Sequence, residues 1–193
     1  MTEAEKNILR NYPHKTISLG VTEDGHRRRS IHVPWQLSCN AYNMRTPDLW
    51  LSPAELFDAE LWAELERLKV VGMYIFCPLA DYGFLSRLAG LQDLAIFQGG
   101  ALRELGFLRQ MPDWYLLHIE DAVLENLEDL IPADPLRRNV CLSGCTVADN
   151  AALERVNLSE LLILAPEGSG NRARWERFPC SKFSYFEYRG KEK

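Results

Sequence analysis

The sequence predicts an α/β protein in which a strand and a short helix alternate along the chain and stack into a solenoid with one curved, mainly parallel sheet. Two observations lead to this prediction. Six β-like runs recur after residue 69, each with large apolar residues two positions apart, and the segments between them carry apolar residues at helical spacing. One such unit cannot bury its apolar face alone, so the units must stack on one another.

The strand runs align in two apolar columns. The first column, with successive gaps of 21, 23, 23, 21 and 22 residues, reads Met73, Leu94, Leu117, Val140, Leu161 and Phe183. The second column, two residues later, reads Ile75, Ile96, Ile119, Leu142, Ile163 and Tyr185. Because side chains alternate across a strand, both columns are expected on one face of the sheet, in the core. Five of the six residues three positions before the first column are also of buried types, the set being Val70, Leu91, Trp114, Arg137, Leu158 and Cys180.

The segments between the strands are predicted to form short helices on the outer face of the sheet. Their apolar stripes are Phe84, Leu85 and Leu88, then Leu102, Leu105 and Leu108, then Val123, Leu127 and Leu130. The chain should turn back into the core five residues after the second column, at Ala80, Ala101, Leu124, Val147 and Gly168.

The spacings Leu91-x-x-Leu94-x-Ile96 and Leu158-x-x-Leu161-x-Ile163 give the chain its family resemblance. Over roughly residues 48–188 it resembles a leucine-rich-repeat protein with divergent, bacterial-type repeats of 21–23 residues. The resemblance implies a right-handed β-α solenoid that binds partners on its concave face. The chain departs from the family three residues after the second column, where Asn or Cys is usual and Cys145 alone conforms.

Two upstream segments are predicted to precede the clear repeats. Ser52-Pro53-Ala54-Glu55 forms a capping box that opens a helix through about Leu68, and Leu49-x-Leu51 reads as an earlier strand of the same sheet. Residues 16–21 and 30–35 flank an Asp24-Gly25 turn and predict a β-hairpin, preceded by a short helix from Thr2. We expect residues 1–47 to form an N-terminal cap and residues 48–193 to form the repeat solenoid as one compact unit with it.

Charge and composition exclude several classes of function. The net charge is −5, but residues 48–134 hold 16 acidic and 5 basic residues, which argues against a nucleic-acid-binding central surface. Five scattered cysteines do not suggest a disulfide framework. The acidic N-terminus and the lack of an apolar run of roughly 18 residues predict a cytoplasmic protein without a membrane partner.

The residues expected to point away from the core form the predicted partner-binding surface, which we call the concave face. The predicted contacts are Tyr74, Phe76, Phe97, His118, Glu120, Leu162, Leu164 and Phe186. This face is more apolar than a solvated sheet requires, which favours a protein partner, and the acidic middle suits a basic one. Two alternatives stay open: the N-terminal segment folds over the face, or the register is wrong and these residues are core.

No catalytic motif is present, so we expect a non-catalytic interaction module without metal or cofactor. A less favoured alternative uses His118, Glu120 and Cys141, expected on neighbouring strands, to bind a metal or small ligand or to activate a nucleophile. A third alternative is a structural subunit that self-assembles, since the last strand, near residues 181–188, should leave its outer edge open. The chain would then be a monomer or a weak homodimer through this edge.

Overall fold

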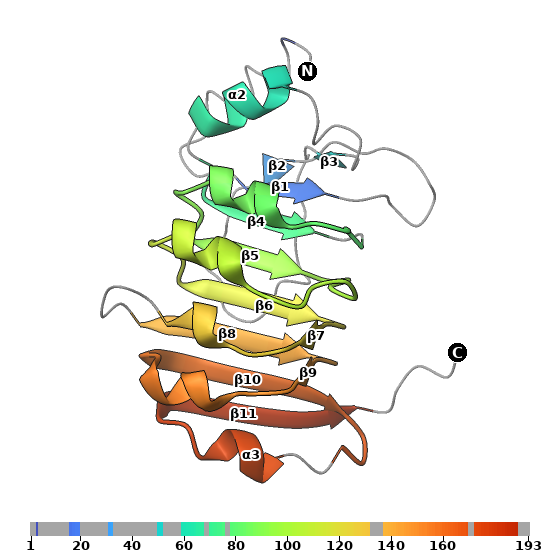
Figure 1. Ribbon diagram of the computed structural model, residues 1–193, viewed down its shortest axis with the longest axis vertical. Helices are drawn as coiled ribbons and strands as arrows, with labels where there is room; N and C mark the ends of the chain where they lie inside the picture. The colour runs from blue at the N-terminus through green and yellow to red at the C-terminus, as the bar shows by residue number, and fades with distance from the viewer. Residues whose placement is uncertain are drawn as a thin grey trace.

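A computed structural model of the chain describes residues 3, 16–19, 31–32, 50–51, 59–67, 70–75, 78–131, 137–169 and 172–188. Within them a nine-stranded sheet runs along the long axis of the molecule, in the order β11-β10-β8-β6-β5-β4-β1-β2, with β3 paired to β1 (Figure 1). The strands are β1 (Thr16–Leu19), β2 (Ile31–His32), β3 (Trp50–Leu51), β4 (Gly72–Ile75), β5 (Asp93–Ile96), β6 (Leu116–Glu120), β8 (Arg138–Ser143), β10 (Leu158–Pro166) and β11 (Cys180–Tyr188). Apart from β1 with β2, the described pairings of this sheet are parallel, which confirms the mainly parallel α/β prediction.

The strand register confirms both apolar columns. Met73 lies opposite Leu94, which lies opposite Leu117, and the series continues through Val140 and Leu161 to Phe183. The second column aligns in the same way from Ile75 to Tyr185. Its members on β4 to β10 are buried, as are those of the first column, while Phe183 and Tyr185 on β11 are partly buried. The repeat of 21–23 residues is therefore the chain length that returns each strand in register beside the last.

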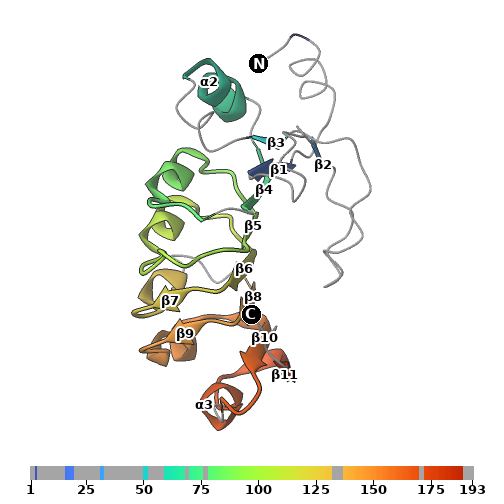
Figure 2. The ribbon, with the colours of Figure 1, turned by 90° about the vertical axis from the view of Figure 1, so that its right-hand side faces the viewer.

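The connections lie on one side of the sheet, as Figure 2 shows, and those between β4 and β10 are 3-10 turns. The helical elements are α2 (Ala59–Arg67), η3 (Gly83–Arg87), η4 (Gly106–Gln110), η5 (Glu128–Leu130), η6 (Ala151–Arg155) and α3 (Arg172–Glu176). In each 3-10 turn a leucine N–H bonds the carbonyl three residues before it, and these leucines, Leu85, Leu108, Leu130 and Leu153, form a third buried column. A repeat of this length leaves room for one tight turn, since the 3-10 form is used in short pieces.

Several predicted inward positions are wrong by one residue. Val123 is 47% exposed, and Leu124 is buried in its place. Ala80 and Ala101 are exposed, while the neighbouring Leu79 and Leu102 are buried. Gly168 is also exposed, whereas Leu124 and Val147 turn inward as predicted. Their strands, β7 (Val123–Leu124) and β9 (Thr146–Val147), pair in parallel as a second small sheet, which sets which residue of each dipeptide faces the core.

Cys145, the residue that conforms to the family pattern, bonds the preceding unit. Its thiol donates to the carbonyl oxygen of Ile119 at 3.3 Å and to that of Ser143 at 3.4 Å. Burial raises the pKa of this thiol to about 11, so it stays protonated as a donor near neutral pH. Cys141, Cys145 and Cys180 form no disulfide bond within the described part of the chain, and Cys39 and Cys77 lie outside it.

The first strands are partly described. β1 and β2 pair antiparallel, with Thr16 opposite His32 and Ile17 opposite Ile31, as the hairpin prediction requires. β3 joins the same sheet as predicted, but it pairs with β1, which also pairs with β4. The hairpin turn, most of the predicted first helix, and the capping box of the next helix lie outside the described residues. Among the residues described, no helix combines the length and the apolar character needed to cross a membrane.

Candidate functional site

The concave face is the side of the sheet that points away from the 3-10 turns. Its middle row aligns Tyr74, Ala95, His118, Cys141, Leu162 and Ser184 on six neighbouring strands. The next row aligns Glu120, Ser143, Leu164 and Phe186, and Phe97 follows directly after β5. Strand register thus brings together seven of the eight predicted contacts. Phe76 lies outside the described residues.

Exposure on this face rises from β4 towards β11. Tyr74 is 2% exposed and Ala95 is 2% exposed at one end, whereas Phe186 is 58% exposed at the other. Between them Phe97, His118, Glu120, Leu162 and Leu164 are partly buried. The more exposed part of the face therefore lies on its C-terminal half, from β6 to β11, and Tyr74 is not part of it.

His118 and Glu120 form the polar centre of the face. His118 Nε2 lies 3.2 Å from Glu120 Oε1, and the Phe97 ring meets the imidazole edge-on with ring centres 5.1 Å apart. Cys141 lies beside His118 on β8. No group of three or more His, Cys, Asp or Glu side chains among the described residues is placed to hold a metal ion. The geometry shows an acid–imidazole pair with a neighbouring thiol, and no third ligand within this part of the chain.

A buried carboxyl group lies at the other end of the face. Asp93 is 4% exposed, and burial raises the pKa of its carboxyl group from 3.8 to about 6, while a hydrogen bond from Tyr115 lowers it in part. Its Oδ1 has no hydrogen-bond partner among the residues that the structure describes. Burial, the Asp93 charge and Tyr115 together raise the pKa of Tyr74 well above its ordinary value. Asp93 is therefore a destabilising buried acid at neutral pH.

Asp121 and Tyr188 lie close together at the edge of the face where the strands have their carboxyl ends. A Cβ atom on Gly144 would lie 2.5 Å from Asp121 Oδ1 and 2.8 Å from the Tyr188 hydroxyl oxygen. Gly144 has a φ of 61° and Asp121 a φ of 54°, in the left-handed region that favours glycine at the first position and tolerates Asp at the second. Sequence reasoning missed both Asp121 and Tyr188. The sequence signal that could have found Tyr188 is the alternation along the last strand, which places Tyr188 on the same face as Ser184 and Phe186.

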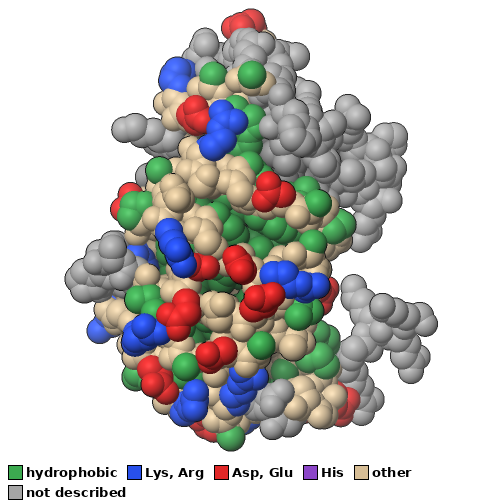
Figure 3. Space-filling model, in the orientation of Figure 1, with side chains coloured by type: hydrophobic (Ala, Val, Ile, Leu, Met, Phe, Trp, Pro, Cys, Tyr) green, Lys and Arg blue, Asp and Glu red, His purple; other side chains and the backbone are tan. Residues whose placement is uncertain are grey.

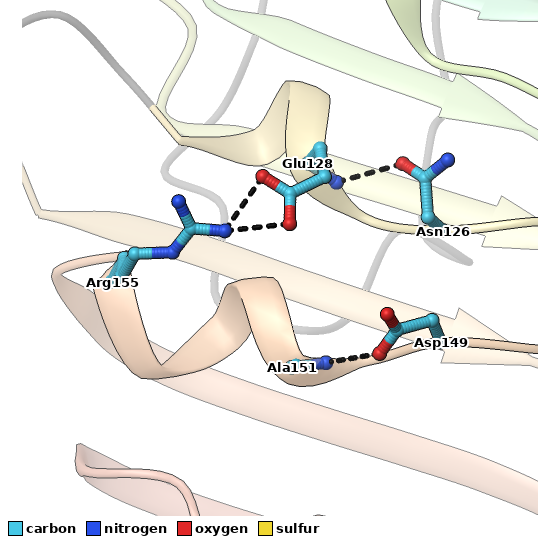
Figure 4. Close-up of polar contacts among 5 residues, drawn as sticks. All are labelled: Asn126, Glu128, Asp149, Ala151 and Arg155. Atoms are coloured by element: carbon cyan, nitrogen blue, oxygen red, sulfur yellow. Dashed lines mark hydrogen bonds and ion pairs between the residues drawn. The ribbon is translucent and has the colours of Figure 1, made fainter.

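The opposite side of the sheet is covered by paired charges. Arg87 Nε lies 2.8 Å from Glu66 and Arg109 Nε lies 2.6 Å from Asp129, so each pair joins two consecutive units. Arg155 on η6 reaches back to both carboxylate oxygens of Glu128 on η5, at 2.5 and 2.6 Å (Figure 4). Figure 3 shows the result as basic and acidic side chains interleaved over this side. These charges are largely neutralised within the chain.

Comparison with known proteins adds a distant likeness. No protein-family model matches the sequence. No curated protein matches it closely enough to count as a relative. A solved structure of internalin C2 from Listeria monocytogenes is similar over part of the chain, at 19% sequence identity and a TM-score of 0.44. The match covers 52% of this chain and 45% of internalin C2, so the chain spans less than half the length of that protein.

Proposed function

We propose that this chain is a leucine-rich-repeat solenoid that binds a protein partner, without catalysis or cofactor, through the C-terminal half of its concave face. The observation that supports the site is the apolar surface formed by Leu162, Leu164 and Phe186 on β10 and β11. Phe186 is 58% exposed, and the two leucines are partly exposed. Docking of a partner would remove this apolar surface from water, which is the main favourable term in protein association.

The leucine-rich-repeat part of the proposal rests on the chain's own geometry. Two core columns continue through six parallel strands in register, one 3-10 turn follows each strand from β4 to β8, and Cys145 bonds the preceding unit through Ile119. This arrangement supports a repeat unit within residues 48–193, and we propose residues 1–47 as its cap. A repeat array of this kind exposes one long sheet face, which suits it to binding an extended surface.

The helical side is a less suitable contact surface. Its charged side chains pair between units, as Arg155 does with Glu128, and a partner there would compete with these pairs. Large apolar residues that are exposed within the described chain are Tyr115, Val123, Phe186 and Tyr188, and two of these four lie on β11. A catalytic or metal-binding use of His118, Glu120 and Cys141 has less support, because these side chains form no group that could hold a metal ion among the described residues.

Affinity capture with a matched pair of variants tests the proposal. We compare the wild type with a Leu162→Asp, Phe186→Asp double variant and with a Val123→Asp control, each shown by circular dichroism to be folded. Val123 is 47% exposed, so the control adds a charge to an exposed apolar site on the other side of the molecule. We expect a protein that binds the wild type and the control and is lost from the double variant, as quantified by mass spectrometry. Equal capture by all three proteins would rule out this half of the face.

Self-assembly is the second candidate. β11 is the outermost strand of the described sheet, and it exposes Phe186 and Tyr188. Unpaired strand edges can pair with another chain. Sedimentation velocity of the wild type distinguishes the candidates, since a dimer that the double variant abolishes would favour self-assembly and a monomer at high concentration would remove it.

A further inference from the structure

We infer that the partner segment bound at the C-terminal half of the concave face carries a Lys or Arg about three positions from an apolar side chain, with the cation at Glu120 and Asp121 and the apolar group on Leu164 and Phe186. This inference rests on the proposed function and specifies the chemistry of the partner. It follows from the charges of the face, from its exposed aromatic rings and from the spacing between them.

The charges come from two consecutive carboxylates at the end of β6. Asp121 is exposed and forms no ion pair within the described residues. The basic neighbour of Glu120 is His118, which is charged only when it is protonated. Lys182, the other basic side chain on this half of the sheet, lies 2.6 Å from Glu160. Within the described part of the chain, Glu120 and Asp121 therefore lack a permanently charged basic neighbour and can offer their negative charge to a partner.

These two carboxylates help to raise the pKa of two neighbouring groups. Burial, and then the charges of Asp121 and Glu120, raise the pKa of the Tyr188 hydroxyl above its ordinary value. The same two charges help to raise the pKa of the Cys145 thiol. The charges of Glu120 and Asp121 thus act on Cys145, which follows β8, and on Tyr188 at the end of β11.

One exposed aromatic side chain, that of Tyr188, borders the same position. The Tyr188 hydroxyl and Asp121 Oδ1 both approach Gly144, and Phe186 lies two residues earlier on β11. Two carboxylates beside a tyrosine hydroxyl suit a guanidinium or an ammonium group, through an ion pair. A phosphate or an acidic segment would be repelled at this position.

The strand spacing fixes the separation of the two contacts. β6, β8 and β10 are consecutive in the sheet, and neighbouring strands lie about 4.8 Å apart, so Glu120 and Leu164 are separated by about 10 Å. An extended peptide that crosses the strands covers this distance in about three residues. We therefore expect the basic residue about three positions from the apolar one.

Selection from a phage-displayed library of random dodecapeptides tests this inference. The immobilised proteins are the wild type, a Glu120→Gln, Asp121→Asn variant, and a Glu104→Gln, Glu125→Gln control that removes two exposed acids away from the face. Asn tolerates the positive φ of Asp121, so the charge is lost without added backbone strain. We expect the wild type and the control to enrich Lys or Arg about three positions from an aromatic or aliphatic residue. On the Glu120→Gln, Asp121→Asn variant the basic preference should fall at least threefold while the apolar preference remains.

Failure of the inference and failure of the proposed function are distinguishable with a fourth protein, Phe186→Asp. If Phe186→Asp loses the selected peptides but the charge variant keeps the full basic preference, the face binds and the inference is wrong. If Phe186→Asp selects the same peptides as the wild type, the proposed face itself is wrong. Enrichment of no sequence, or of sequences without basic residues, by the wild type also overturns the inference.

Discussion

Two adjacent arginines show how burial depends on a single residue. Arg137 is exposed, whereas Arg138 is 0% exposed, with its guanidinium 4.8 Å from the centre of the Trp114 ring. Arg138 also donates to the carbonyl oxygens of Trp114 and Pro112. The register shifts next to it, because Leu158 pairs with Arg138 while Glu160 pairs with Asn139. Because of this register shift, Arg138 takes the interior position before the first column, and Arg137 does not.

Replacement of Arg138 by Met should destabilise the fold by about 2–4 kcal/mol, because two buried carbonyl groups lose charge-assisted hydrogen bonds. The same change at Arg137 should cost at most about 0.5 kcal/mol, as expected for an exposed site. Urea unfolding followed by tryptophan fluorescence measures both. Equal costs for the two variants would show that the contacts of Arg138 do not stabilise the fold.

Asp93 makes stability depend on pH. The folded state raises the pKa of this carboxyl group from 3.8 to about 6, so folding favours its protonated form. Between about pH 4 and pH 6 the folded protein holds the proton more tightly than the unfolded chain does, and the stability contributed by this group declines as pH rises. Above about pH 6 the penalty is constant.

An Asp93→Asn variant should lack this decline and should be more stable than the wild type at pH 7, by up to about 3 kcal/mol. The amide oxygen can still accept the hydrogen bond from Tyr115, so the change removes the charge and keeps the contact. Free energies of unfolding measured from pH 4 to pH 8 give the comparison. Parallel pH curves for the two proteins would contradict the assignment.

At the scale of elements, Asx-type turns open three of the 3-10 turns. Side-chain oxygens of Asp81, Asn126 and Asp149 accept the backbone N–H two residues later, at 2.8, 3.0 and 2.9 Å (two of these bonds appear in Figure 4). Asp and Asn favour such local bonds, which offer the backbone an alternative to a regular helix. Together with the short repeat, they explain why the predicted helices are 3-10 turns.

Asp149→Ala should lower the free energy of unfolding by about 1 kcal/mol, since the N–H of Ala151 loses its acceptor. Asp149→Asn should retain most of the stability, because an amide oxygen can accept the same bond. Thermal and urea unfolding of the three proteins measure the effect. An Asn variant as unstable as the Ala variant would assign the effect to the charge of Asp149 instead of the hydrogen bond.

At the scale of the whole molecule, one continuous apolar core joins the described units from α2 onward, from Trp62 on α2 to Phe178 after α3. The exposure of the concave face is not uniform over this array. Tyr74 and Phe186 occupy neighbouring rows of the face and are both aromatic, yet the first is buried and the second is 58% exposed. Sequence alternation places both on this face and cannot distinguish them, because their burial depends on what packs around each strand.

Alternation and repeat length are local properties of the chain, so the sequence alone determined the two core columns, the parallel strands and the membership of the concave face. Tertiary structure decided which of two neighbouring residues turns inward, as with Val123 and Leu124 or Arg137 and Arg138. It also brought Asp121 to Tyr188, far along the chain, across Gly144. These outcomes depend on the register between units and on left-handed backbone at the ends of the strands. Both are set by contacts between neighbouring units, and the pattern within one repeat does not contain them.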